Sequence, residues 1–168
     1  AVDLALRLAA DPGIEQAFPD LHTPQRATSF DDPGYPGQWY MDLLGMEPLW
    51  DVSLGDPDIR VAVLDSGIDV DHPDLAGAWV EPYDSLDDDD DPRPPGPDDG
   101  HGTAVAGIIS AQANNGIDLV GVCPDCTLVP IRMLGDRNGT LGQTIAAFEH
   151  AIAADADVIN NSWGYTQA

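Results

Sequence analysis

Two residues of the chain, Asp65 and His101, have the side chains and the surroundings for acid–base chemistry near neutral pH. His101 stands in DDGHGTAVAGIISA, at the expected first turn of a helix, where the helix dipole favours a neutral imidazole that accepts a proton. Such a base needs a carboxylate to fix its tautomer, and Asp65, after the apolar run VAVL, could provide it. Each residue alone also has an ordinary explanation, Asp65 as a turn residue and His101 as a helix-start residue bonded to a loop carbonyl.

Strands and helices in alternation must position these residues. The predicted elements are a strand within 58–67, a helix at 101–113, a strand at 127–134, a helix at 140–155 and a strand within 157–164. Strand, helix and strand at these lengths predict a right-handed βαβ unit in a parallel sheet. Sites in such sheets form beyond the carboxyl ends of the strands. We therefore expect Asp65, His101 and the segment Ser162-Trp163-Gly164 to meet at one edge.

Both predicted helices have apolar residues at helical spacing, and we expect these residues to face a core. They are Val105, Ile108 and Ile109 in the first helix, and Leu141, Ile145, Phe148 and Ile152 in the second. The acidic, proline-rich residues 87–100 are a predicted loop.

The composition excludes several classes of protein. The 168 residues are 43% apolar, enough for a globular domain, and no apolar run approaches the roughly 18 residues of a membrane span. Thirty acidic residues against six arginines give a net charge of −24, which opposes binding to nucleic acid. That charge fits a secreted, calcium-loaded or salt-adapted protein, or simply a soluble surface. Cys123 and Cys126, in CPDC, favour a local disulfide or two free thiols over a redox or zinc site.

Three motifs together resemble the subtilisin-like serine proteases, or subtilases: VAVLDSGIDVDHPDL, then HGTAVAGIISA, then VINNSWG. The resemblance runs from about residue 30 to residue 164. It implies an α/β, three-layer subtilisin-like fold with a mostly parallel central sheet, incomplete in this chain. It also implies that Asp65 is the acid and His101 the general base of an Asp-His-Ser triad. The backbone around Ser162, Trp163 and Gly164 would bind the substrate peptide as an added strand, and Ser162 would not be the nucleophile.

Some features are similar to the kexin-like proprotein convertases, a branch of the same family. These are DDPGYPGQWYM, the acidic loop before His101, and SWG. The convertases carry a second Asp directly after the triad Asp, and this sequence has Ser66 there. The resemblance therefore does not extend to a preference for basic residues in the substrate.

Calcium is the cofactor that the resemblance implies. The matching ligands are the side chains of Asp32, Asp74 and Asn115, and the backbone carbonyls of Ala113, Ile117 and Leu119. An ordinary Asn-Gly turn is the alternative for this segment. The acidic run offers a second calcium site, as in convertases, at Asp84, Asp87, Asp89 and Asp91. A solvated loop explains that run equally well.

The resemblance also suggests a domain organisation. Residues 1–20 resemble the end of a subtilase propeptide, as in a zymogen activated by proteolytic processing, with an ordinary N-terminal extension as the alternative. Residues 21–37 are a predicted linker, and residues 38–168 the N-terminal portion of a subtilase catalytic domain. Without an initiator Met or a leader, the chain is expected to be a processed product, secreted or periplasmic.

The family's nucleophilic Ser and oxyanion Asn lie further downstream than SWG. An acid and a base without a nucleophile cannot form an acyl-enzyme. We therefore expect a serine endopeptidase in which this chain, inactive alone, supplies Asp65 and His101. A C-terminal chain of the same protease would supply the Ser and the oxyanion Asn, and a protein or peptide would be the substrate. The alternative is a non-catalytic, peptide- or calcium-binding subtilase-like module.

Overall fold

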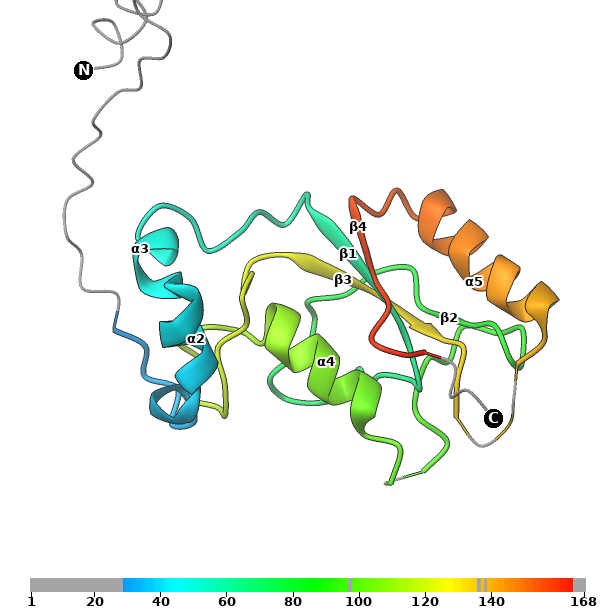
Figure 1. The fold of residues 1–168 in the computed structure, drawn as a ribbon, viewed down its shortest axis with the longest axis horizontal. Helices are drawn as coiled ribbons and strands as arrows, with labels where there is room; N and C mark the ends of the chain where they lie inside the picture. The colour runs from blue at the N-terminus through cyan, green and yellow to red at the C-terminus, as the bar shows by residue number, and fades with distance from the viewer. Residues whose placement is uncertain (1–28, 97, 136, 138, 165–168) are drawn as a thin grey trace, which may run out of the picture.

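The computed structural model describes residues 29–96, 98–135, 137 and 139–164 (Figure 1). In chain order the elements are a 3-10 helix η1 (Tyr35–Gly37), α2 (Trp39–Leu44), α3 (Met46–Trp50), β1 (Arg60–Asp65), β2 (Tyr83–Asp84), α4 (His101–Ser110), β3 (Thr127–Arg132), α5 (Leu141–Ala153) and β4 (Val158–Asn160). The three predicted strands and two predicted helices are confirmed. The propeptide-like segment 1–20 lies outside the described residues.

A parallel sheet forms the centre of the described chain. Its strand order is β2-β3-β1-β4, and every pairing is parallel. Residues 61–65 and 128–132 are buried throughout, as expected for inner strands covered on both faces. The register sets Asp65 beside Arg132, so the carboxyl ends of β1 and β3 lie level with each other.

Helices α4 and α5 cover opposite faces of this sheet. Val61 and Val63 point to one face and pack with Ala106 of α4. Ala62 and Leu64 point to the other face and pack with Ala147 of α5. Because successive strand side chains alternate between faces, these two clusters form two core layers around one sheet. The predicted three-layer α/β architecture is therefore confirmed.

The prediction for the inner face of α4 was wrong at one position. Gly102, Ala106 and Ser110 are buried against the sheet, with Val105 and Ile109 partly buried beside them. Ile108 is instead 44% exposed. The small residues let the helix backbone approach the sheet closely, and this rotates Ile108 outward.

The prediction for α5 was wrong over most of its apolar face. Ala147 and Ala151 are fully buried, and only Phe148 of the predicted set packs against the core. Leu141, Ile145 and Ile152 are respectively 75%, 49% and 68% exposed. The helix docks through its alanines and Phe148, so the other three apolar side chains face away from this sheet.

Residues 29–37, the end of the predicted linker, lie against the domain. Asp32 is 2% exposed, and Phe30 and Tyr35 pack edge-to-face against each other and on Trp50. The backbone N–H of Gly34 donates to the carbonyl of Asp118 at 2.5 Å. This contact leaves no room for a side chain, since a Cβ at Gly34 would lie 2.2 Å from that oxygen. The domain boundaries themselves stay a prediction.

The turn between α4 and β3 contains the Cys123–Cys126 disulfide, one of the two alternatives that the sequence left open. The backbone N–H of Asp125 donates to the Leu54 carbonyl, and the indole N–H of Trp50 donates to the Val122 carbonyl. These two hydrogen bonds fasten the turn to the segment before β1. No helix among the described residues is long and apolar enough to cross a membrane.

Candidate active site

Asp65 and His101 meet at the carboxyl edge of the sheet. Asp65 is the last residue of β1 and is fully buried, whereas His101 is the first residue of α4 with a side chain 60% exposed. Nδ1 of His101 lies 2.7 Å from Oδ1 of Asp65. A carboxylate at this distance favours the tautomer that carries its proton on Nδ1. Nε2 then has a free lone pair and can accept a proton from a neighbouring group.

Backbone groups hold the carboxylate in place. The N–H of Ser66 donates to Oδ1 of Asp65 at 2.7 Å, and the N–H groups of Met133 and Leu134 donate to the Asp65 carbonyl. Oδ2 of Asp65 is buried and accepts no hydrogen bond within the described part of the chain. One carboxylate oxygen is therefore committed to the histidine and the backbone, while the other can accept from a further donor.

The first turn of α4 packs closely against the loop that follows β1. A Cβ at Gly102 would lie 2.4 Å from the Gly67 carbonyl oxygen and 3.0 Å from Cβ of Asp65. Only a residue without a side chain allows this approach. The glycine after His101 thus sets how near the imidazole comes to its carboxylate.

The segment Ser162-Trp163-Gly164 follows β4 at this same edge of the sheet. Ser162 and Gly164 are exposed, and Trp163 packs partly against the cluster under α5. Among the described strands, β4 pairs with β1 alone, so its other edge has room for another strand. The sequence-based expectation of one shared edge is met, and the substrate-binding role stays a prediction.

Asp32, Asp74 and Asn115, the side chains of the first calcium set, lie together. Both carboxylates are only 2% exposed. Asp32 accepts hydrogen bonds from the backbone of Asn114 and Asn115, at 2.8 and 3.3 Å. Asp74 accepts from the Asn115 amide at 2.8 Å and from the Leu119 backbone at 3.0 Å. In the described residues neither carboxylate is paired with an arginine, so two buried carboxylates from separate segments bond the same loop, residues 113–119.

The carbonyl donors expected for this site, at Ala113, Ile117 and Leu119, belong to the same loop. The described residues hold no group of three His, Cys, Asp or Glu side chains suited to a metal. A calcium ion here would thus take two carboxylates, an amide and backbone carbonyls, which is an ordinary mixture of ligands for this cation. The residues present fit the ion.

Arginines already pair with three of the four carboxylates in the second expected calcium set. Asp84 is 1% exposed and pairs with the buried Arg132 at 2.5 Å. Asp87 pairs with Arg132 at 3.2 Å and also with Arg137. The hydrogen bond from Arg137 is the main cause that lowers the pKa of Asp87 below its usual value.

The other two residues of that set, Asp89 and Asp91, are exposed on the surface. Asp91 pairs with Arg93 at 2.8 Å, and this hydrogen bond lowers the pKa of Asp91. Asp89 is exposed and accepts a hydrogen bond from the Asp91 backbone. Because three of the four carboxylates are bonded to arginines, this set as arranged does not fit a second calcium ion.

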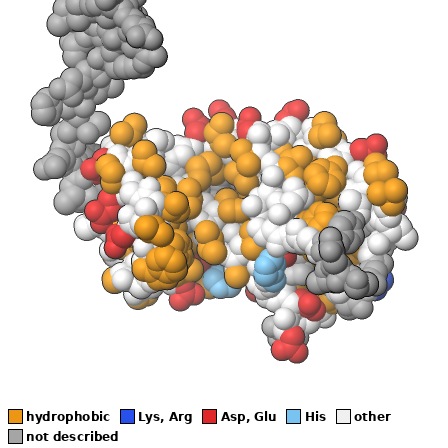
Figure 2. All heavy atoms as spheres, in the orientation of Figure 1, with side chains coloured by type: hydrophobic (Ala, Val, Ile, Leu, Met, Phe, Trp, Pro, Cys, Tyr) orange, Lys and Arg blue, Asp and Glu red, His pale blue; other side chains and the backbone are white. Residues whose placement is uncertain are grey.

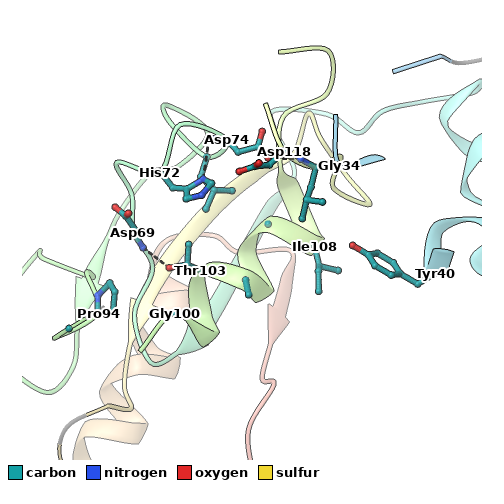
Figure 3. Close-up of a pocket in the computed structure, with 15 residues that line it drawn as sticks. Gly34, Tyr40, Asp69, His72, Asp74, Pro94, Gly100, Thr103, Ile108 and Asp118 are labelled. Carbon is teal, nitrogen blue, oxygen red and sulfur yellow. Dashed lines mark hydrogen bonds between the residues drawn. The ribbon is translucent and has the colours of Figure 1, made fainter. Parts of the chain in front are cut away.

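A pocket of about 680 Å³ lies on the outer face of α4, and sequence reasoning missed it. Figure 3 shows Ile108 and Tyr40 on one side of it, and His72, Asp74 and Asp118 near the other. Ile108, which faces away from the sheet, lines this pocket. The signal in the sequence was the pair of small residues that line the pocket beside Ile108 on α4, Ala104 one turn before it and Gly107 directly before it.

Comparison with known proteins agrees with this arrangement. The model of the subtilase family matches residues 56–168. The thermophilic serine proteinase of Bacillus sp. (strain AK1) is 41% identical over 117 residues, covering 68% of this chain and 28% of that protein. The minor extracellular protease Vpr of Bacillus subtilis is 38% identical over 130 residues, covering 72% of this chain and 16% of that protein.

Solved structures give the same result for the fold. A protease from Pseudoalteromonas arctica superposes with a TM-score of 0.70 at 29% identity, over 84% of this chain and 52% of that one. The chain spans less than a third of the length of the two bacterial relatives and about half of the solved protease. The family match covers well over half of the 168 residues and includes both Asp65 and His101. This chain belongs to the subtilase family.

Proposed function

We propose that the chain supplies the acid and the general base of a serine endopeptidase. The observation that carries this proposal is the 2.7 Å contact between the buried Asp65 carboxylate and the exposed His101 ring. An imidazole held by a buried carboxylate and open to solvent on its other side can take a proton from a serine hydroxyl. The serine itself would come from a segment downstream of this chain.

In the proposed reaction, His101 removes the proton from the serine as the hydroxyl attacks a peptide carbonyl. Asp65 holds the ring and stabilises the imidazolium that forms. His101 then gives the proton to the departing amine, and a water molecule repeats the cycle on the acyl-enzyme. An amide side chain and a backbone N–H of the downstream segment would stabilise the oxyanion. The peptide substrate would lie along Ser162, Trp163 and Gly164 as an added strand.

Replacement of the base tests this role. His101→Ala should abolish peptide hydrolysis by the assembled protease while leaving the assembly intact. His150→Ala is the matched control, because His150 belongs to α5 on the opposite face of the sheet from α4, where it stacks on Tyr83 and bonds the Glu81 carbonyl. Unchanged hydrolysis in the His101→Ala protein would rule out the enzyme role and favour a non-catalytic binding module.

Large exposed apolar surfaces support a partner segment from the same protease. Trp39, Leu43 and Leu44 of α2 are 61–76% exposed, and Figure 2 shows apolar side chains gathered over this helix. On α5, Leu141, Ile145 and Ile152 are also exposed. Patches of this kind usually mark an interface. Native and denaturing mass spectrometry should show a complex that separates into this chain and a second one, and a single 17.8 kDa species in both would contradict the proposal.

We also propose that Asp32, Asp74, Asn115 and the carbonyls of residues 113, 117 and 119 hold a calcium ion. The support is a pair of buried carboxylates, from two separate segments, that both bond the loop of residues 113–119 and pair with no arginine in the described residues. When bound, the ion would offset their charge and stabilise the loop. Calcium at 100 times its Kd should add about 2.7 kcal/mol of stability, measured as a rise in Tm that a chelator reverses. Asp74→Asn should remove this response, Asp71→Asn on the surface should keep it, and equal responses in both variants would refute the site.

Secretion is the localisation that we propose. The Cys123–Cys126 disulfide is favoured in an oxidising compartment, and the relative Vpr is named an extracellular protease. Recovery of the protein, with the disulfide intact, from the medium rather than the cytoplasm of its source cells would test this.

A further inference from the structure

Ser66 bonds the Asp65 carboxylate, the segment that enters α4 and the first turn of α4. It directly follows Asp65 and is only 9% exposed. Its backbone N–H donates to Oδ1 of Asp65 at 2.7 Å, and its hydroxyl donates to the carbonyl of Asp99 at 3.1 Å. The same hydroxyl accepts a hydrogen bond from the backbone N–H of Gly102 at 3.2 Å.

The bond to Gly102 compensates for a missing helix cap. The first N–H groups of a helix have no acceptor within the helix, and an N-cap side chain normally supplies one. The N-cap residue of α4 is Gly100, and no side-chain cap is formed there. The hydroxyl of Ser66 takes this place from a position 36 residues earlier in the chain.

A cap supplied from outside the helix does more than satisfy a donor. A local N-cap moves with its helix, whereas the Ser66 hydroxyl belongs to the loop that begins at Asp65. It therefore ties the first turn of α4, including His101, to the loop that carries the acid. The second bond, to Asp99, fixes the segment that enters the helix. The hydroxyl must both donate and accept, which a carboxylate or a methyl group at this position cannot do.

We propose that Ser66 is a positioning residue for His101. Ser66 holds the start of α4 close to the loop after β1, and this keeps Nδ1 of His101 bonded to Asp65. This role rests on the proposed function of His101 as the general base. The hydroxyl of Ser66 bonds the backbone at Asp99 and Gly102 and would act on the base through these two bonds. Its loss should weaken the contact between imidazole and carboxylate and leave the surface that binds the peptide unchanged.

The test is a set of variants in the assembled, active protease. Ser66→Ala should reduce kcat about 10- to 100-fold, since small misplacements of a catalytic group have effects of this size, with KM within about twofold. The acid limb of the pH profile of kcat/KM should move to lower pH, because a loosened carboxylate stabilises the imidazolium less. Ser66→Thr keeps the hydroxyl and should restore kcat.

Ser110→Ala is the matched control. Ser110 is fully buried in the same helix, at its other end, and its hydroxyl donates to the Cys126 carbonyl at 2.8 Å. Its removal should cost similar stability but leave kcat and the pH profile unchanged. A loss of kcat in Ser110→Ala as large as in Ser66→Ala would overturn the positioning role, because general destabilisation would explain both.

A spectroscopic signal separates this inference from the proposed function. The Nδ1–H proton of His101 should give a strongly downfield NMR resonance when bonded to Asp65, whether or not the protein turns over substrate. That resonance should move upfield in Ser66→Ala and return in Ser66→Thr. If Ser66→Ala does not fold, Ser66→Cys, with its weaker hydrogen bonds, should shift the signal in the same direction. An unchanged resonance in a folded variant that lacks the hydroxyl would overturn the inference, whereas full hydrolysis by His101→Ala would overturn only the proposed function.

Discussion

Gly102 offers the sharpest test of how the fold sets the distance between base and acid. In Gly102→Ala the new methyl group would lie 2.4 Å from the Gly67 carbonyl oxygen, which is backbone and cannot turn away. Relief of that overlap requires the start of α4 to move outward by about 1 Å, to reach ordinary contact distance. Because His101 precedes Gly102, its ring would move with the helix, and the 2.7 Å bond to Asp65 would stretch beyond hydrogen-bond range. We expect kcat to fall by about 100-fold.

Gly107→Ala provides the comparison within the same helix. Nothing lies within 4 Å of a Cβ at Gly107, so the methyl group enters open space. This variant should gain up to about 1 kcal/mol in the free energy of unfolding, from helix propensity alone, and keep wild-type activity. Steady-state kinetics and urea unfolding on both variants would decide the matter. Wild-type kcat in Gly102→Ala, or an equal loss in Gly107→Ala, would refute the argument that this close approach positions His101.

Two further predictions concern stability. Arg132→Met removes the arginine that pairs with the buried carboxylate of Asp84, and it should cost about 3–5 kcal/mol in the free energy of unfolding. Arg93→Met breaks only exposed pairs and should cost about 0–1 kcal/mol. Equal costs for the two variants, measured by urea unfolding, would contradict this prediction. Burial and the hydrogen bond to Glu47 raise the pKa of Tyr35 from 10.0 to about 12. The unfolded chain then loses the phenolic proton first, so stability should fall as the pH rises from 10 to 12. Tyr35→Phe should weaken this decline, and an identical decline in that variant would refute the assignment.

The strands and helices near the site were predictable from local sequence patterns. The run before Asp65 is apolar and bounded by DSG, and α5 carries a repeating apolar pattern after the capping box of Thr140 and Gln143. The two-residue strand β2 was missed, because Tyr83 and Asp84 become a strand only by pairing with β3. A partner 48 positions away leaves no trace in the local pattern.

Periodicity revealed that α5 has an apolar stripe but not which of its faces meets the sheet. Alanine contributes little to a hydrophobic pattern, yet Ala147 and Ala151 make the close contact. The meeting of Asp65 and His101 could be predicted, since parallel strands place their ends at one edge. The cap from Ser66 could not, because it depends on the packing of α4 against a loop 36 residues away in sequence.

Leu141, Ile145 and Ile152 form an exposed apolar stripe on α5, and this stripe leads to a last prediction about the proposed partner segment. Ile152 is 68% exposed, and full burial of such a side chain is worth about 1.5–3 kcal/mol. A partner that covers the remaining surface would thus gain roughly 1–2 kcal/mol from it, and Ile152→Glu should weaken the assembly by about 5- to 30-fold or more. Ala153→Glu is the control, since Ala153 is exposed but lies off the stripe. Both variants should fold alike, because neither side chain supports this chain's own core. Equal affinities in a titration of the two separated chains would show that the stripe faces solvent and that the partner docks elsewhere.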